Sequence, residues 1–215
     1  TVAIGAHWNG GGAGGAGHVR VYQYNGFSWN QLGQDIDGEA SGDGSGWSVS
    51  LSSDGNTVAV GAPSNDESAT DAGHVRIYEL DSNSVSWNQI GQDIDGEGDS
   101  GAFGYSISLS SNGNIIAIGA NNAKDANNTR KGHVRVFQNI NNTWIQIGYD
   151  IDGEGQDDQS GNSVSLSSDG NIVAIGAPLN DGTDNNAGHV RVFHVGEETQ
   201  YTSPPCSGCT DSLAL

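Results

Sequence analysis

The chain has 215 residues, which is enough to bury a sizeable core or to build several small repeated units. Its 26 acidic and 7 basic residues give a net charge of -19, which excludes a nucleic-acid-binding surface and opposes binding to an anionic membrane. We therefore expect no nucleic-acid partner, and no direct membrane insertion because no apolar run approaches the roughly 20 residues of a membrane helix.

The first predicted elements are short strands. The apolar segment TVAIGA (1–6) is bounded by glycine and predicts a buried strand. The alternating segment GHVRVYQ (17–23) and the tryptophan-led segment WNQLG (29–33) predict two half-buried strands. An acidic segment follows, and SVSLS, which begins at Ser48, predicts a fourth strand with strict alternation.

These four segments recur in the same order with a period of about 57 residues, and GHVR begins at residues 17, 73, 132 and 188. No segment shows helical periodicity with caps. We therefore expect an all-β fold, a β-propeller of repeated four-stranded antiparallel blades, in which neighbouring blades bury both faces of each sheet. A solenoid is the alternative, but its repeats are usually shorter.

The count of segments predicts a partial or incomplete ring. Residues 1–195 hold three full repeats and part of a fourth, whereas most propellers have four to eight blades. We expect a linker at 196–205 and the start of a Cys-containing tail module at 206–215, with Cys206 and Cys209 in disulfides with residues outside the chain. A CxxC redox site is the other interpretation. The chain is read as a piece of a longer protein.

Residues FGYSISL (103–109) and GAP (61–63 and 176–178) resemble the FG-GAP repeat, the blade of the integrin α-subunit propeller. The resemblance implies a β-propeller whose blades often bind calcium between their first two strands. The corresponding loop here is SSDGN or SSNGN, which keeps only Asp54 and Asp169 as carboxylates. A calcium ion needs more carboxylate ligands than that, so we interpret this loop as a tight hairpin and not as a calcium site.

The acidic segment that links one unit to the next contains GQDIDGE or GYDIDGE. Its alternate carboxylates could bind Ca²⁺, which is the only cofactor that the sequence suggests. A solvated acidic turn is a second interpretation, and a partner for the repeated arginine of GHVR is a third. The candidate metal ligands are Asp35, Asp37, Glu39, Asp93, Asp95, Glu97, Asp150, Asp152 and Glu154. Most of the 26 acidic residues are expected at one rim of the propeller.

The repeated basic residues are predicted to be structural. The arginine of each GHVR is expected to form an ion pair with a carboxylate at the interface between blades. The four residues are Arg20, Arg76, Arg135 and Arg191. The histidine two positions before each arginine is also expected to be structural, because one histidine per blade leaves the four too far apart to share a metal.

Tryptophan occurs in two contexts. Trp29, Trp87 and Trp144 open the last strand of each unit and are expected to pack between blades, with an aromatic sugar-binding row as the alternative. Trp8 and Trp47 fall outside the repeat pattern and are better candidates for binding a ligand.

No catalytic motif recurs or stands out, so the sequence predicts that the protein is not an enzyme. We expect a non-enzymatic extracellular or cell-surface module for adhesion or assembly, with other extracellular proteins, matrix or copies of itself as partners. A calcium-dependent domain that binds a glycan or a protein is one alternative, and an accessory domain of a secreted hydrolase is another. Asn127 and Asn141 lie in glycosylation sequons, which is consistent with an extracellular location.

Overall fold

The computed structural model describes residues 1–10, 14–182 and 184–196. These residues form β-strands and no helix, which confirms the all-β prediction. The predicted tail with Cys206 and Cys209, and most of the predicted linker, lie outside the described residues.

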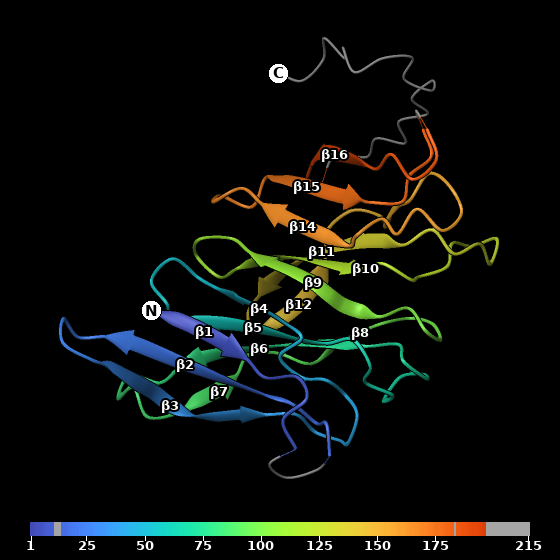
Figure 1. The fold of residues 1–215 in the computed structure, drawn as a ribbon. Coiled ribbons are helices and arrows are strands. Elements are labelled where there is room, and N and C mark those ends of the chain that lie inside the picture. Colours follow the sequence, from blue (N-terminus) through green and yellow to red (C-terminus); the bar gives the residue numbers. More distant parts are fainter. Residues whose placement is uncertain (11–13, 183, 197–215) are drawn as a thin grey trace.

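The strands form four antiparallel sheets that follow one another in chain order, here called blades I to IV (Figure 1). Blade I contains β1 (Val2–Gly5), β2 (His18–Tyr24) and β3 (Trp29–Asp37). Blade II contains β4 (Ser48–Leu51), β5 (Thr57–Ala62), β6 (His74–Leu80), β7 (Trp87–Gln89) and β8 (Ile94–Asp95). Blade III contains β9 (Phe103–Leu109), β10 (Ile115–Ala120), β11 (His133–Ile140), β12 (Thr143–Gln146) and β13 (Ile151–Asp152). Blade IV contains β14 (Ser163–Leu166), β15 (Ile172–Ala177) and β16 (His189–His194).

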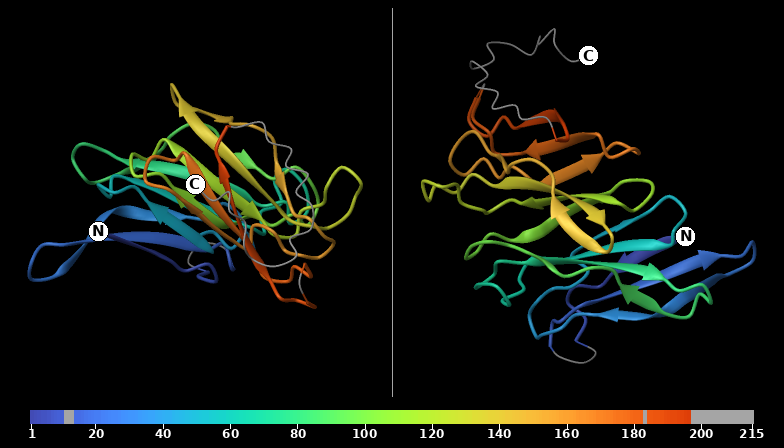
Figure 2. Two further views of the ribbon diagram at one scale, coloured as in Figure 1. Left: turned by 90° about the horizontal axis from the view of Figure 1, so that it is seen from above. Right: turned by 180° about the vertical axis from the view of Figure 1, so that it is seen from behind.

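The blades stack as an open arc and not as a closed ring, as the repeat count predicted (Figure 2). Each blade is an up-and-down meander, and its first strand lies beside the first strand of the next blade. Ser48 Oγ on β4 donates a hydrogen bond to the carbonyl of Gly104 on β9 at 2.7 Å. Ser106 Oγ on β9 donates in the same way to Gly161 at 2.8 Å. The first strands are therefore the inner strands of the arc.

The acidic motif differs from the expectation of a loop. Its Asp-Ile-Asp part continues the outer edge of blades I to III, where Asp37 pairs with His18, Asp95 with His74 and Asp152 with His133. Alternation explains this pairing, because residues i and i+2 of a strand point to one side and the residue between them points to the other. Ile36 and Ile94 are each 4% exposed, so burying the isoleucine holds the flanking carboxylates on the opposite side.

The core lies between successive blades. Val19 and Val21 of β2 pack with Val58 and Val60 of β5, and all four are at most 1% exposed. Two further clusters join blade II to blade III and blade III to blade IV in the same manner. Each fully buried valine contributes about 1.5–3 kcal/mol, so stacking of blades is the main source of stability. On β16, which no further blade covers, Val190 and Val192 are 68% and 64% exposed.

Two of the repeated tryptophans tie neighbouring blades together. Trp87 Nε1 donates a hydrogen bond to the carbonyl of Leu32 in blade I at 2.8 Å. Trp144 Nε1 donates to Ile90 in blade II at 2.9 Å. Both rings are buried, which confirms the prediction of packing between blades, whereas Trp29 has no preceding blade to cover it and is 55% exposed.

In blades II to IV, the hairpins between the first two strands form one end of the arc. Asp54 Oδ1 accepts hydrogen bonds from Ser52 Oγ at 2.6 Å and from the amide of Asn56 at 3.0 Å. These bonds lower the pKa of the Asp54 carboxyl. Asp169 makes the same contacts with Ser167 and Asn171. The SSDGN segment is therefore a hairpin stabilised by its own aspartate, as its sequence predicted.

The acidic connections lie at the other end, where the loops that enter blades II and IV contact the loop between the second and third strands of the same blade. Asp43, which is 3% exposed, accepts hydrogen bonds from the amide of Ala40 and from Asn65 Nδ2, each at 3.0 Å. Asp158 joins Gly155 to Asn180 in the same way. These two buried aspartates lock loops together, and we call this end of the arc the acidic rim.

Candidate functional site

The four repeated arginines each contact a carboxylate, and the contacts differ between blades. Arg20 binds Asp35 of its own blade with two nitrogens, the shorter contact being Nη2–Oδ2 at 2.7 Å. Its guanidinium lowers the pKa of the Asp35 carboxyl. In blades II to IV the glutamate of the preceding motif contacts the arginine, in the pairs Arg76–Glu39, Arg135–Glu97 and Arg191–Glu154. These later pairs connect one blade to the loop that enters it.

The nine candidate metal ligands fall into different environments. Asp35 and Asp37 lie near His18, but Asp35 is engaged by Arg20. Glu97 and Glu154 contact arginines, and Asp150 accepts a hydrogen bond from Gln146 at 2.8 Å. Burial raises the pKa of the Asp95 carboxyl and that of Asp152. Glu39 and Asp93 are the two that belong to a cluster of four possible ligands, whereas Asp35 and Asp37 form a cluster of three with His18.

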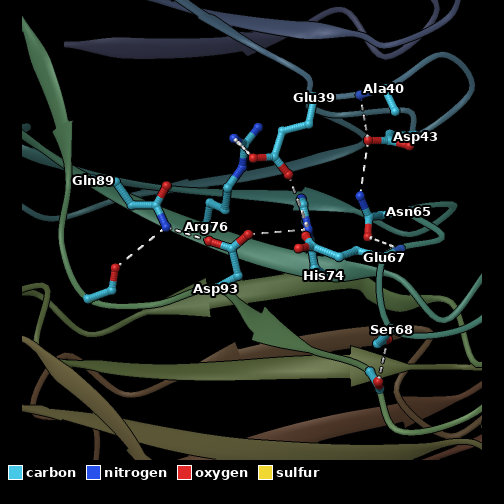
Figure 3. A network of polar contacts seen from close by, with 12 residues as sticks. Glu39, Ala40, Asp43, Asn65, Glu67, Ser68, His74, Arg76, Gln89 and Asp93 are labelled. Carbon is cyan, nitrogen blue, oxygen red and sulfur yellow. Dashed lines mark hydrogen bonds and ion pairs between the residues drawn. The ribbon is translucent and has the colours of Figure 1, made fainter.

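Glu39 and Asp93 converge with Glu67 and His74 on the acidic rim of blade II, as Figure 3 shows. One ligand atom from each of the four lies within 4.8 Å of the others. Sequence reasoning missed Glu67, which lies in the loop after β5, and treated His74 as purely structural. An open depression of about 440 Å³ adjoins this cluster and is lined by Glu39, Ala40, Ser41, Asp43, Asn65, Asp66 and Glu67.

His74 is the buried member of this cluster. Its residue exposure is 1%, and its Nδ1 atom has no hydrogen-bond partner. Nδ1 lies 3.8 Å from Asp93 Oδ2 and 3.9 Å from Glu39 Oε2. Burial lowers the pKa of the His74 imidazole to about 4, so the ring is neutral at pH 7. Burial also raises the pKa of the Glu39 carboxyl.

A second candidate site is an aromatic cluster at the inner strands, formed by His7, Trp8, Trp47 and Tyr105. The ring of His7 lies 5.4 Å from that of Trp8 and 4.8 Å from that of Trp47. The ring of Trp47 lies 5.4 Å from that of Tyr105 on β9. Trp8 is 73% exposed and Trp47 is 41% exposed, so the cluster presents ring faces to solvent.

This aromatic cluster breaks the symmetry of the repeats. His7 directly follows the segment IGA, where the other three units have Pro63, Asn121 and Pro178. Trp47 and Tyr105 occupy equivalent positions directly before and within the inner strands β4 and β9, and the third unit has Asn162 there. A repeat has no structural need for one aromatic corner, so this asymmetry marks the cluster as a candidate for function.

The FG-GAP repeat family model matches residues 36–78, which run from the end of β3 to β6. Residues 36–78 form an FG-GAP repeat. The structure explains why the motif has glycine at these two positions. The glycine of GAP contacts the glycine of FG on the next blade. A Cβ atom at Gly61 would lie 2.3 Å from the carbonyl oxygen of Gly104, so only glycine fits where these FG-GAP strands approach. No curated protein matches the chain.

Among solved structures, the periplasmic gluconolactonase of Pseudomonas aeruginosa matches 89% of this chain with a TM-score of 0.55 and 16% sequence identity. This chain spans about half of that structure, 49% of its length. A putative 6-phosphogluconolactonase of Bacteroides fragilis matches 65% of this chain and 34% of its own, with 17% identity and a TM-score of 0.43. The first likeness supports the propeller fold.

The comparison corrects the expectation of a non-enzymatic adhesion module. A solved structure that matches 89% of this chain in fold is a gluconolactonase, and this contradicts the expectation of a non-enzymatic module. The expectation rested on the absence of known catalytic motifs and on charged residues that follow the repeat. Trp8 and Trp47 stood out in the sequence only as candidates for binding a ligand.

Proposed function

We propose that this protein is a hydrolase that opens a sugar lactone, and that the aromatic cluster of His7, Trp8, Trp47 and Tyr105 binds the substrate. The observation that carries the proposal is this exposed, symmetry-breaking cluster at the inner strands of a fold shared with a gluconolactonase. Because the chain spans about half of that structure, the lactonase activity of this chain is a proposal.

The aromatic faces suit a sugar ring. The C–H faces of a sugar are apolar and pack on aromatic rings, which supply a large apolar area with a defined geometry. Trp8 and Trp47 flank the imidazole of His7, with ring centroids 5.4 and 4.8 Å from it. A lactone stacked on these rings would hold its carbonyl carbon beside the imidazole of His7, a side chain type that acts as a general base.

The chemistry follows from that placement. The imidazole of His7 removes a proton from water as the water oxygen attacks the lactone carbonyl carbon. The tetrahedral intermediate collapses with cleavage of the bond between that carbon and the ring oxygen. The ring oxygen takes the proton back from the imidazolium, so lactone and water give the open hydroxy acid and His7 returns to its neutral form.

We also propose that the protein acts outside the cytoplasm. The matched gluconolactonase is a periplasmic protein, and the sequons at Asn127 and Asn141 are on exposed residues. Among the described residues, none belongs to a helix long and apolar enough to span a bilayer. Protein partners in that compartment, including copies of this chain, stay a prediction.

The test is hydrolysis of glucono-δ-lactone by the full chain, followed by proton release above the spontaneous rate. We expect His7→Asn to lower kcat by about 100-fold or more, the usual contribution of a general base. Trp47→Ala should raise KM by roughly tenfold, because about 1.4 kcal/mol of stacking would be lost. His194→Asn is the matched control, since His194 is an exposed histidine on β16 away from the cluster.

Two results would overturn the proposal. One is a wild-type rate no greater than the spontaneous rate for glucono-δ-lactone and for its 6-phosphate. The other is activity that His7→Asn leaves at the level of the His194→Asn control.

A further inference from the structure

We propose that Glu39, Glu67, His74 and Asp93 bind one divalent transition-metal cation, such as Mn²⁺ or Zn²⁺, on the acidic rim of blade II. The proposal uses none of the aromatic residues and does not depend on the lactonase activity. It differs from the calcium site expected from sequence in its ligand set and in its metal.

The geometry is close to that of a ligand shell. His74 Nδ1 lies 3.8 Å from Asp93 Oδ2 and 3.9 Å from Glu39 Oε2, and Glu67 completes a group with all ligand atoms within 4.8 Å. Ligands about 2.1 Å from a tetrahedral metal lie about 3.4 Å from one another. The largest separations would have to shrink by up to about 1.4 Å, which the exposed side chains of Glu39 and Glu67 can supply by rotation.

His74 supplies the independent observation that points to a ligand. A buried nitrogen without a hydrogen bond is costly, and native proteins rarely keep one. His74 Nδ1 is such an atom, and it faces the carboxylates of Glu39 and Asp93 (Figure 3). A cation between them would satisfy this nitrogen and offset the repulsion among three carboxylates.

The other blades carry incomplete versions of the same arrangement. In blade III, His133, Asp150 and Glu97 are the equivalents of His74, Asp93 and Glu39. The equivalent of Glu67, five residues after the strand, is Asp125, and its carboxylate binds the ammonium of Lys131 at 3.0 Å. In blade III, the lysine ammonium therefore already pairs with the carboxylate that would be the fourth metal ligand. In blade I, Arg20 occupies Asp35 with two nitrogens.

Arg76 offsets part of the negative charge of the site and still leaves Glu39 able to bind a cation. Its Nη1 atom lies 3.1 Å from Glu39 Oε1, while the other oxygen of Glu39 faces His74. Glu39 can therefore bridge the guanidinium and a cation. Two further carboxylates and one imidazole remain, which is a common donor set for divalent cations.

The donor types select the class of metal. Ca²⁺ and Mg²⁺ prefer shells made of oxygen, whereas imidazole nitrogen suits Zn²⁺ and related transition metals, and Mn²⁺ suits carboxylate oxygen and binds N/O sites less tightly than Zn²⁺. A shell of one imidazole and three carboxylates should therefore bind Mn²⁺ and Zn²⁺ more tightly than Ca²⁺.

The experiment is thermal unfolding and electron paramagnetic resonance of the chelator-treated full chain with MnCl₂, ZnCl₂ or CaCl₂. All proteins carry Cys206→Ser and Cys209→Ser, so that tail thiolates contribute nothing. At a metal concentration 100 times Kd, we expect Tm to rise by roughly 5–10 °C. Bound Mn²⁺ should show nitrogen-14 modulation from His74 in the spin-echo spectrum.

Glu67→Gln should abolish the Tm rise, because it removes one ligand from an exposed position with little effect on folding. The matched control is Asp99→Asn, which removes one exposed carboxylate from the next acidic loop and should keep the full rise. His74→Gln should remove the nitrogen signal. The proposal fails if no metal raises Tm, if Glu67→Gln and Asp99→Asn behave alike, or if Ca²⁺ raises Tm more than Mn²⁺ and Zn²⁺ at equal concentration.

Discussion

The ring of Trp87 joins blade II to blade I, and replacing it by alanine measures how strongly the blades depend on each other. Trp87 is 4% exposed, belongs to the cluster that contains Val19 and Val58, and donates a hydrogen bond to Leu32 at 2.8 Å. Removing a buried tryptophan costs about 3–5 kcal/mol, and the Leu32 carbonyl would lose its donor. For a chain of this length we expect Tm to fall by roughly 10 °C.

Thermal unfolding followed by far-UV circular dichroism measures the fall in Tm, and urea unfolding measures the change in the free energy of unfolding. Trp29→Ala is the matched control, because Trp29 has the equivalent position in blade I but is 55% exposed, and its cost should stay below about 1 kcal/mol. Trp87→Phe should fall between the two, since it keeps an aromatic ring and removes the N–H group. Equal effects of Trp87→Ala and Trp29→Ala would refute the stacking of blades as the source of stability.

Two further predictions concern buried polar groups. Burial lowers the pKa of the His133 imidazole below its usual 6.5, so the unfolded chain takes up this proton first as the pH falls. The free energy of unfolding should therefore decrease as the pH falls from about 7 through 6.5, and His133→Gln should flatten that part of a pH series of urea midpoints; an unchanged slope would contradict the assignment. Asp43→Ala leaves the Ala40 amide and Asn65 Nδ2 without their acceptor and should cost about 1–3 kcal/mol. Asp99 is exposed, so Asp99→Ala should lower the free energy of unfolding by less than about 0.5 kcal/mol. Equal losses for Asp43→Ala and Asp99→Ala would show that Asp43 does not stabilise the loops of the acidic rim.

The fold could be predicted because the same strand pattern recurs along the chain in three full repeats and part of a fourth. Alternation in SVSLS and GHVRVYQ, and the apolar run that ends in GA, give strand identity, order and blade length. What the sequence concealed was the strand within the acidic motif. Three carboxylates in five residues suggest a loop, yet one buried isoleucine, Ile94, is enough to hold the Asp-Ile-Asp segment against β6.

The candidate sites were less predictable, because they depend on contacts between loops. The sequence made Glu39 and Asp93 candidate metal ligands. It did not single out Glu67, because the sequence of its loop differs between the units, and its proximity to His74 is visible only in the folded structure. Trp8 and Trp47 stood out because they break the pattern. His7 did not, since a single histidine after IGA has no meaning until its ring is found between theirs.

The central functional claim is that a sugar acid binds the aromatic cluster, and the indole N–H signals of the protein test it most directly. The chain has five tryptophans, so a nitrogen-15 spectrum resolves one indole signal for each, and Trp→Phe variants assign them. On titration with gluconate, the product of the proposed reaction, we expect the signals of Trp8 and Trp47 to shift and saturate while those of Trp87 and Trp144 stay in place. Signals of Trp8 and Trp47 that do not move at product concentrations of tens of millimolar, or that move no more than that of Trp29, would contradict the account.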